Sequence, residues 1–112
     1  MITIDIQYKN SKIEKICTKE KYMESFFGHD QLLIEGLKTL IVLLENEESI
    51  YNFKEKKYLI GYNLEKIVNS DKLSLRIVPK KDKRKERMII MTISNDGSSI
   101  CIQEINDHKY KV

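Results

Sequence analysis

The stretch QLLIEGLKTLIVLLENEE, residues 31–48, carries the clearest structural signal in the chain. Its apolar positions recur in steps of three and four residues, at Leu33, Ile34, Leu37, Leu40, Ile41 and Leu44. This spacing predicts a helix with one apolar face in the core. Gly36 lies within the stripe, and we expect it to let a second helix approach closely. The acidic end of the stretch opposes the helix dipole, and we expect it to be solvated and frayed.

A second helix is predicted immediately before this stretch, over residues 11–27. Ser11 followed by Glu14 is the pattern of a capping box, in which each residue satisfies an amide of the first turn. Gly28 suits the left-handed position that ends a helix, and Asp30 can cap the helix that follows. His29 stands between them and is interpreted as a turn residue. The sequence therefore predicts a hairpin of two helices.

Strand patterns flank this helical hairpin on both sides. ITIDIQY (2–8) and KLSLRIV (72–78) alternate in the period of a strand, and RMIIMTI (87–93) is apolar on both faces, as in a central strand. SSICIQEI (98–105) follows the turn signal NDG (95–97). Residues 50–70 fit either a short strand or a connection that crosses the core. The order predicts an α+β fold: an N-terminal strand, a two-helix hairpin, and a three-stranded antiparallel sheet.

Composition indicates one soluble domain spanning residues 1–112. The chain is 41% hydrophobic and has a net charge of +3. This net charge by itself is weak evidence for nucleic-acid binding. Cys17 and Cys101 match no metal-binding spacing, so we expect free thiols in a reducing compartment. The start lacks the features of a signal peptide, and no apolar stretch is long enough to span a membrane. We expect a cytoplasmic protein without a metal ion or other cofactor.

Positive charge is concentrated in PKKDKRKER, residues 79–87. Six cationic and two acidic side chains give this stretch a local charge of +4, which exceeds that of the whole chain. The flanking strand patterns place the run at a hairpin tip, where long cationic side chains can contact the phosphates of RNA. The alternative is a solvated turn. The candidate RNA-binding residues are Lys80, Lys81, Lys83, Arg84, Lys85 and, on the preceding strand, Arg76.

The ending IQEINDHKYKV (102–112) supplies groups that can move a proton. The pKa of a histidine lies near neutrality, so His108 is a candidate for proton transfer. Asp107 can orient its imidazole, and Tyr110 can act as a weak acid or stack on a base. Arg87 is predicted beside a strand, where an ordered guanidinium can stabilise a phosphorane. The alternative without a catalytic role is that His108 is a surface residue and Arg87 forms an ion pair.

These segments, in this order, resemble the RelE/ParE superfamily of bacterial toxins, and most closely its HigB-like branch, the plasmid maintenance killer proteins. Arg87-Met88-Ile89-Ile90 is similar to the R-L-I-F of that branch, and Asp107 matches the aspartate of its I-x-D-Y-H ending. His108 and Tyr110 correspond to the tyrosine and histidine of that ending only as an exchanged pair. Tyr62 stands where the branch carries a histidine in the pattern H-x-L.

This resemblance implies a toxin of a toxin–antitoxin system. The implied activity is a metal-independent endoribonuclease that cuts mRNA on translating ribosomes, and the implied partner is a cognate antitoxin. The implied roles are proton transfer by His108, a second proton transfer or base stacking by Tyr110 or Tyr62, and stabilisation of the phosphorane by Arg87. Residues 79–87, which we call the basic segment, would bind the RNA backbone.

Two other functions remain open on the sequence. A ParE-like member of the same superfamily poisons DNA gyrase and cuts no RNA, and it has no need of an acid–base pair at the end of the chain. A degenerate member would bind RNA through the basic segment without cleaving it, and the tyrosine at position 62 favours this alternative. Assays of supercoiling and of RNA cleavage distinguish these functions.

Overall fold

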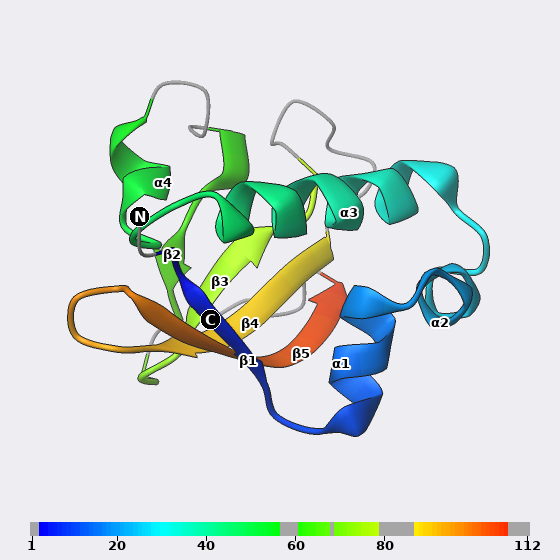
Figure 1. Ribbon diagram of the computed structural model, residues 1–112, viewed down its shortest axis with the longest axis horizontal. Coiled ribbons are helices and arrows are strands. Elements are labelled where there is room, and N and C mark those ends of the chain that lie inside the picture. Colours follow the sequence, from blue (N-terminus) through cyan, green and yellow to red (C-terminus); the bar gives the residue numbers. More distant parts are fainter. Residues whose placement is uncertain (1–2, 57–60, 68, 79–86, 108–112) are drawn as a thin grey trace.

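The computed structural model describes residues 3–56, 61–67, 69–78 and 87–107 (Figure 1). Four helices lie within these ranges: α1 (Ser11–Thr18), α2 (Glu20–Phe26), α3 (Gln31–Glu45) and the single turn α4 (Asn52–Glu55). Five strands form one sheet: β1 (Asp5–Tyr8), β2 (Glu65–Lys66), β3 (Leu73–Arg76), β4 (Arg87–Ile93) and β5 (Ser99–Asp107). The chain has the mixed α+β composition that the sequence predicts.

The sheet has the strand order β1-β5-β4-β3-β2. The expected antiparallel strands β3, β4 and β5 lie together, with β4 in the centre, but the sheet is larger than the three strands predicted. Strand β2 adds a two-residue edge beside β3, and β1 pairs with β5 in parallel. A parallel pair needs a long crossover, and the helices that follow β1 are part of that connection.

Helix α3 runs across one face of the sheet (Figure 1). Its predicted leucine stripe is confirmed, because Leu33, Leu37, Leu40 and Leu44 are all buried in the core. The strands contribute the other side of this core through Leu75, Ile77, Ile89, Met91, Ile100, Ile102 and Ile105. We call this side of the sheet the helix face and the opposite side the far face.

The predicted first helix is broken into two. Lys19 adopts an extended conformation between α1 and α2, and the two helices point in different directions (Figure 1). The Thr18 hydroxyl donates a hydrogen bond to the Glu14 carbonyl four residues back, a contact that often bends helices. The cap is also one residue earlier than expected, because the Asn10 side chain accepts from the amide of Ile13. Asparagine caps as well as serine does.

The start of α3 confirms two expectations. Gly28 has a φ of +60°, in the left-handed region, and the Asp30 carboxylate accepts from the amides of Leu32 and Leu33. Gly36 does not face another helix, which corrects the prediction made for it. A Cβ at position 36 would lie 3.0 Å from the Ile77 carbonyl oxygen, so this glycine lets α3 approach the end of β3.

The acidic segment after α3 is also different from the prediction. Glu47 is buried, and its carboxylate accepts hydrogen bonds from the Asn52 amide group and the Lys56 ammonium. Its carbonyl accepts from the Ile4 amide at 2.7 Å. The segment is therefore held in place at the start of β1 and beside α4. The sequence did not reveal this because the partners of Glu47 are five and nine residues further along the chain.

Candidate functional site

The ends of three strands, β3, β4 and β5, meet at one end of the sheet. Arg87, the first residue of β4, is paired in register with Asp107, the last residue of β5. The Ile77 amide donates to the Arg87 carbonyl at 3.0 Å, so the chain just after β3 reaches the same place. We call this the Arg87 end of the sheet. Val78, which precedes the basic segment (residues 79–87), lies here, and so do Arg87, which ends that segment, and Asp107, which precedes His108.

Several predicted site residues lie outside the described ranges. These are the cationic residues of the basic segment, Lys80, Lys81, Lys83, Arg84 and Lys85, and the two proton-transfer candidates of the chain ending, His108 and Tyr110. The backbone of Asp107 is described as the end of β5. The roles of all these residues remain predictions.

Arg76 is a buried cation on the far face, with 5% of its surface exposed. Alternation along β3 puts it on the side opposite Leu75 and Ile77, whose side chains fill the core. Its Nε donates a hydrogen bond to the Val78 carbonyl at 3.1 Å. That bond restricts the orientation of the guanidinium plane, and a guanidinium held in this way can bind an anion with less loss of entropy than a mobile side chain.

The residues across the sheet from Arg76 give the far face its polar character. Arg76 pairs with Met88, and Met88 pairs with Asn106 on β5. The Asn106 side-chain amide donates to the Glu104 carboxylate at 3.1 Å. Because paired residues share a face, Asn106 and Glu104 lie on the same side of the sheet as Arg76. The far face thus combines a cation, an amide and a carboxylate, three groups that can contact a polar ligand.

Sequence reasoning missed Glu104 and Asn106, although the sequence contains a signal for them. The buried isoleucines of β5 are Ile100, Ile102 and Ile105, so the apolar step changes from two residues to three. The strand register shifts at this point, opposite Ile90 and Met91. A bulge of this kind adds one unpaired residue and reverses the faces of those that follow. Ile105 thereby enters the core, while its two neighbours point to the far face.

Tyr62 lies in the core, with 6% of its surface exposed. Its ring packs edge-to-face on Phe53, with centroids 5.9 Å apart. Burial raises the pKa of the Tyr62 hydroxyl above its ordinary value. This environment favours a packing role over proton transfer. His29 is exposed in the turn between α2 and α3 with a φ of +62°, as its interpretation as a turn residue requires.

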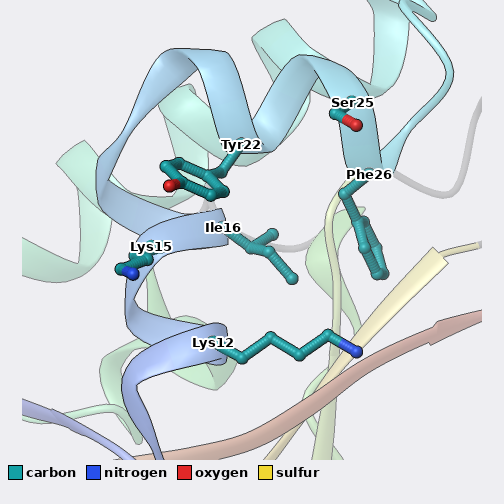
Figure 2. A pocket seen from close by; sticks show the side chains of 6 residues that line it. All are labelled: Lys12, Lys15, Ile16, Tyr22, Ser25 and Phe26. Atoms are coloured by element: carbon teal, nitrogen blue, oxygen red, sulfur yellow. The ribbon is translucent and has the colours of Figure 1, made fainter.

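Three hollows on the described surface lie among the helices and β1. One is lined by Lys12, Lys15, Ile16, Tyr22, Ser25 and Phe26, between α1 and α2 (Figure 2). A second of about 340 Å³ lies between β1 and the end of α3, and a third of about 510 Å³ lies between α3 and the two shorter helices. Neither Arg76 nor Arg87 lines any of the three.

Histidine, cysteine, aspartate and glutamate side chains are scattered over the described residues. This part of the chain contains no group of three or more such side chains arranged to hold a metal ion. Both cysteines are free thiols, as expected, with Cys17 buried and Cys101 half-buried. Among the described helices, none has the length and apolar character needed to cross a bilayer.

The chain was compared with models of protein families, with curated proteins and with solved structures, and no match was found in any of the three comparisons.

Proposed function

We propose that this protein is a toxin of the RelE/ParE type, close to the HigB-like branch, and that it cleaves mRNA on translating ribosomes without a metal ion. The observation that supports the proposal most is the register that pairs Arg87 with Asp107. It places Arg87, the last residue of the basic segment, beside Asp107, the first residue of the ending DHKY (107–110), at one end of the sheet. A nuclease of this kind needs RNA-binding cations and proton-transfer groups at the same place.

The proposed reaction transfers a phosphoryl group within the RNA. The 2′-oxygen attacks the adjacent phosphorus, the bond to the 5′-oxygen breaks, and the products are a 2′,3′-cyclic phosphate and a free 5′-hydroxyl. His108 takes the proton from the 2′-hydroxyl, oriented by Asp107, and Tyr110 gives a proton to the departing 5′-oxygen. Arg87 stabilises the additional negative charge of the phosphorane. Lys80, Lys81, Lys83, Arg84 and Lys85 hold the RNA backbone.

Arg76 is also part of this proposal, as an RNA-binding residue on the far face. It is buried and oriented by Val78, whereas alternation along β4 puts Arg87 on the helix face with Ile89, so Arg76 would contact the RNA from the opposite side of the sheet. Glu104 and Asn106 stand across the sheet from it and can contact the ribose or base of the bound nucleotide. The silencing partner in this proposal is a cognate antitoxin, encoded by a short neighbouring gene.

The test is cleavage of mRNA in a translating extract and the chemical identity of the new ends. We expect cyclic phosphate ends from the native protein and at least a hundredfold less product from His108→Ala, on the order of what a general acid–base group contributes. His29→Asn is the matched histidine control, because asparagine tolerates the left-handed conformation at that position. Loss of activity in both variants, or in neither, would contradict the assignment.

A second experiment separates RNA binding from catalysis. Changing Lys80, Lys81, Lys83, Arg84 and Lys85 to glutamine should weaken binding of single-stranded RNA and reduce its salt dependence by about 0.7 in logarithmic slope for each lost phosphate contact. Lys9→Gln with Lys66→Gln is the control, since both lysines are exposed elsewhere in the chain. An unchanged slope in the first variant would show that the basic segment does not hold RNA.

The burial of Tyr62 favours a second candidate, a member of the same fold that binds RNA without cleaving it. The branch carries a histidine at this place, whereas here the side chain packs on Phe53. Salt-dependent RNA binding with no cleavage in the extract would establish this function. Inhibition of gyrase supercoiling with no effect on RNA would instead establish the ParE-like function.

A further inference from the structure

We infer that the pocket between α1 and α2 binds an acidic segment of a protein partner, which inserts a large apolar side chain between the two helices. The α1–α2 pocket has a volume of about 360 Å³ and is lined by Lys12, Lys15, Ile16, Tyr22, Ser25 and Phe26. This inference goes beyond the proposed action on RNA and does not depend on it.

The break at Lys19 creates the pocket. Helices α1 and α2 diverge at this residue, and their side chains do not close the angle between them. In Figure 2 the Ile16 side chain points into the space bounded by Lys12 of α1 and Phe26 of α2. Ile16 is buried and lines the pocket, so it forms an apolar floor.

Two aromatic side chains on the pocket wall are unusually exposed. Tyr22 and Phe26 expose 47% and 43% of their surfaces, and their i, i+4 spacing places them on one side of α2. Only three other large apolar residues of the described chain are exposed, namely Leu32, Val42 and Tyr51. Exposed aromatic residues grouped around a pocket are typical of the central contacts of protein interfaces.

The positive charge at the rim of the pocket indicates an acidic partner. Lys12 and Lys15 line it, and the Lys15 ammonium lies 5.4 Å from the centre of the Tyr22 ring. The acidic residues of the two helices, Glu14, Glu20 and Glu24, do not line it, and Glu20 is paired with Lys38 of α3. An apolar floor with a cationic rim is complementary to an apolar side chain on an acidic segment.

A small anionic amphiphile is a poorer fit than a protein segment. Ligand pockets usually bury most of the ligand surface. The two aromatic rings here are themselves nearly half exposed, so an acyl chain in the pocket would remain largely in contact with water. A protein segment can cover these rings with its own backbone and neighbouring side chains, and thus bury them as it binds.

The test uses the full-length protein and a synthetic peptide of about 15 residues, long enough to form a helix, with leucine and phenylalanine on one face and glutamate on the other. Binding is followed by NMR shifts of isotope-labelled protein. We expect saturable shifts centred on Lys12, Tyr22 and Phe26. Lys12→Glu with Lys15→Glu should weaken binding on the order of tenfold, because each reversed charge replaces an attraction with a repulsion of similar size.

Matched controls decide between the possible outcomes. Val42→Ser removes an exposed apolar residue that lines a different hollow and should leave peptide binding unchanged, whereas Tyr22→Ser with Phe26→Ser should abolish it. A peptide with lysine in place of glutamate should not bind. The inference is overturned if the two peptides bind alike, if the shifts centre elsewhere, or if octanoate occupies the pocket more tightly than the acidic peptide.

Discussion

Glu47 is the residue whose environment departs most from what its neighbours in the sequence suggest. It stands in a run of acidic residues, yet its side chain is only 4% exposed and accepts hydrogen bonds from Asn52 at 2.8 Å and from Lys56 at 2.9 Å. A buried carboxylate is stable only when it is paired and hydrogen-bonded. We interpret it as the anchor that joins the end of α3 to α4 and, through its carbonyl, to Ile4.

We therefore expect Glu47→Ala to lower the free energy of unfolding by about 2 to 3 kcal/mol, because the hydrogen bonds of the carboxylate with Asn52 and Lys56 are lost together. The measurement is urea unfolding followed by circular dichroism. Glu48→Ala is the control: its side chain is exposed, and the expected change is within about 0.5 kcal/mol. Equal effects of the two substitutions would mean that the contacts of Glu47 do not stabilise the fold.

Asp96 in the turn between β4 and β5 is a second residue whose contacts have a measurable consequence. Its carboxylate accepts from the Ser98 hydroxyl at 2.7 Å, the Ser98 amide at 3.0 Å and the Ser94 hydroxyl at 3.0 Å. The contacts with Ser98, and then the one with Ser94, lower the pKa of Asp96 below its ordinary value. The charged form is therefore the one that organises the turn.

The direction of the pH dependence follows from this lowered pKa. The stabilisation is complete above the pKa of the unfolded chain and is lost as the pH falls through the lower pKa of the folded protein. We expect the amide resonance of Ser98 to titrate with that lower pKa, and Ser98→Ala to raise the pKa of Asp96 toward its ordinary value. An unchanged Asp96 titration in the variant would contradict the contacts.

At the scale of elements, the β4–β5 hairpin shows how a turn is fixed by what packs on it. Gly97 has a φ of +74°, and its amide donates to the Ser94 carbonyl. Its carbonyl accepts from the Ile50 amide at 2.9 Å, so the turn is joined to the segment before α4. A Cβ at this position would lie 2.4 Å from the Ser49 hydroxyl oxygen and 2.7 Å from the Tyr51 ring.

Gly97→Ala should therefore destabilise the protein more than Gly28→Ala does. At Gly28 a Cβ meets nothing within 4 Å, so the expected cost is the left-handed strain alone, about 1 kcal/mol. At Gly97 the same strain is joined by a steric clash, and we expect a total loss of about 2 to 4 kcal/mol. Thermal unfolding of the two variants measures the difference. Equal losses would show that Ser49 and Tyr51 move aside at no cost.

The elements that the sequence predicted correctly are those whose signal is local. The leucine spacing of α3, the cap at Asp30 and the hairpin turn at Gly97 depend on neighbouring residues, and all three are present. The parallel pairing of β1 with β5 depends on residues more than ninety positions apart, and no local pattern encodes it. The break at Lys19 was missed because apolar residues continue on both sides of it.

The candidate site was predictable in part for the same reason. Arg76 stands out in a strand pattern, so its place on the sheet could be inferred, but its burial depends on what covers both faces. Glu104 and Asn106 could be assigned to the far face only by inferring, from the change in isoleucine spacing, the bulge in β5 that reverses the alternation. The substitution of Tyr62 for the histidine of the resembled branch was visible in the sequence, whereas its packing on Phe53 was not.

At the scale of the whole molecule, the two ends of the described chain stabilise each other. Strand β1 lies beside β5, and the Lys9 amide donates to the Ile102 carbonyl just before α1 begins. Helix α1 then packs its buried residues Ile16 and Cys17 into the core that α3 and the sheet share. Opening α1 therefore exposes part of the central core, and we expect it to open only when the whole domain unfolds.

The buried thiol of Cys17 reports that opening directly. Cys17 is 4% exposed, and burial raises its pKa to about 12, so the folded protein presents almost no reactive thiolate at neutral pH. In the variant Cys101→Ser we expect Cys17 to react with a thiol reagent at least about a thousandfold more slowly than in urea, in line with the equilibrium constant of a stable domain. In Cys17→Ala the half-buried Cys101 should react much faster under the same native conditions.

The reaction of Cys17 should also depend on the stability of the whole domain. Because Cys17 reacts only in the unfolded protein, Glu47→Ala should accelerate its reaction by the same factor by which it raises the equilibrium constant of unfolding. A Cys17 rate that is insensitive to Glu47→Ala would mean that α1 detaches by itself, while the sheet and α3 remain folded.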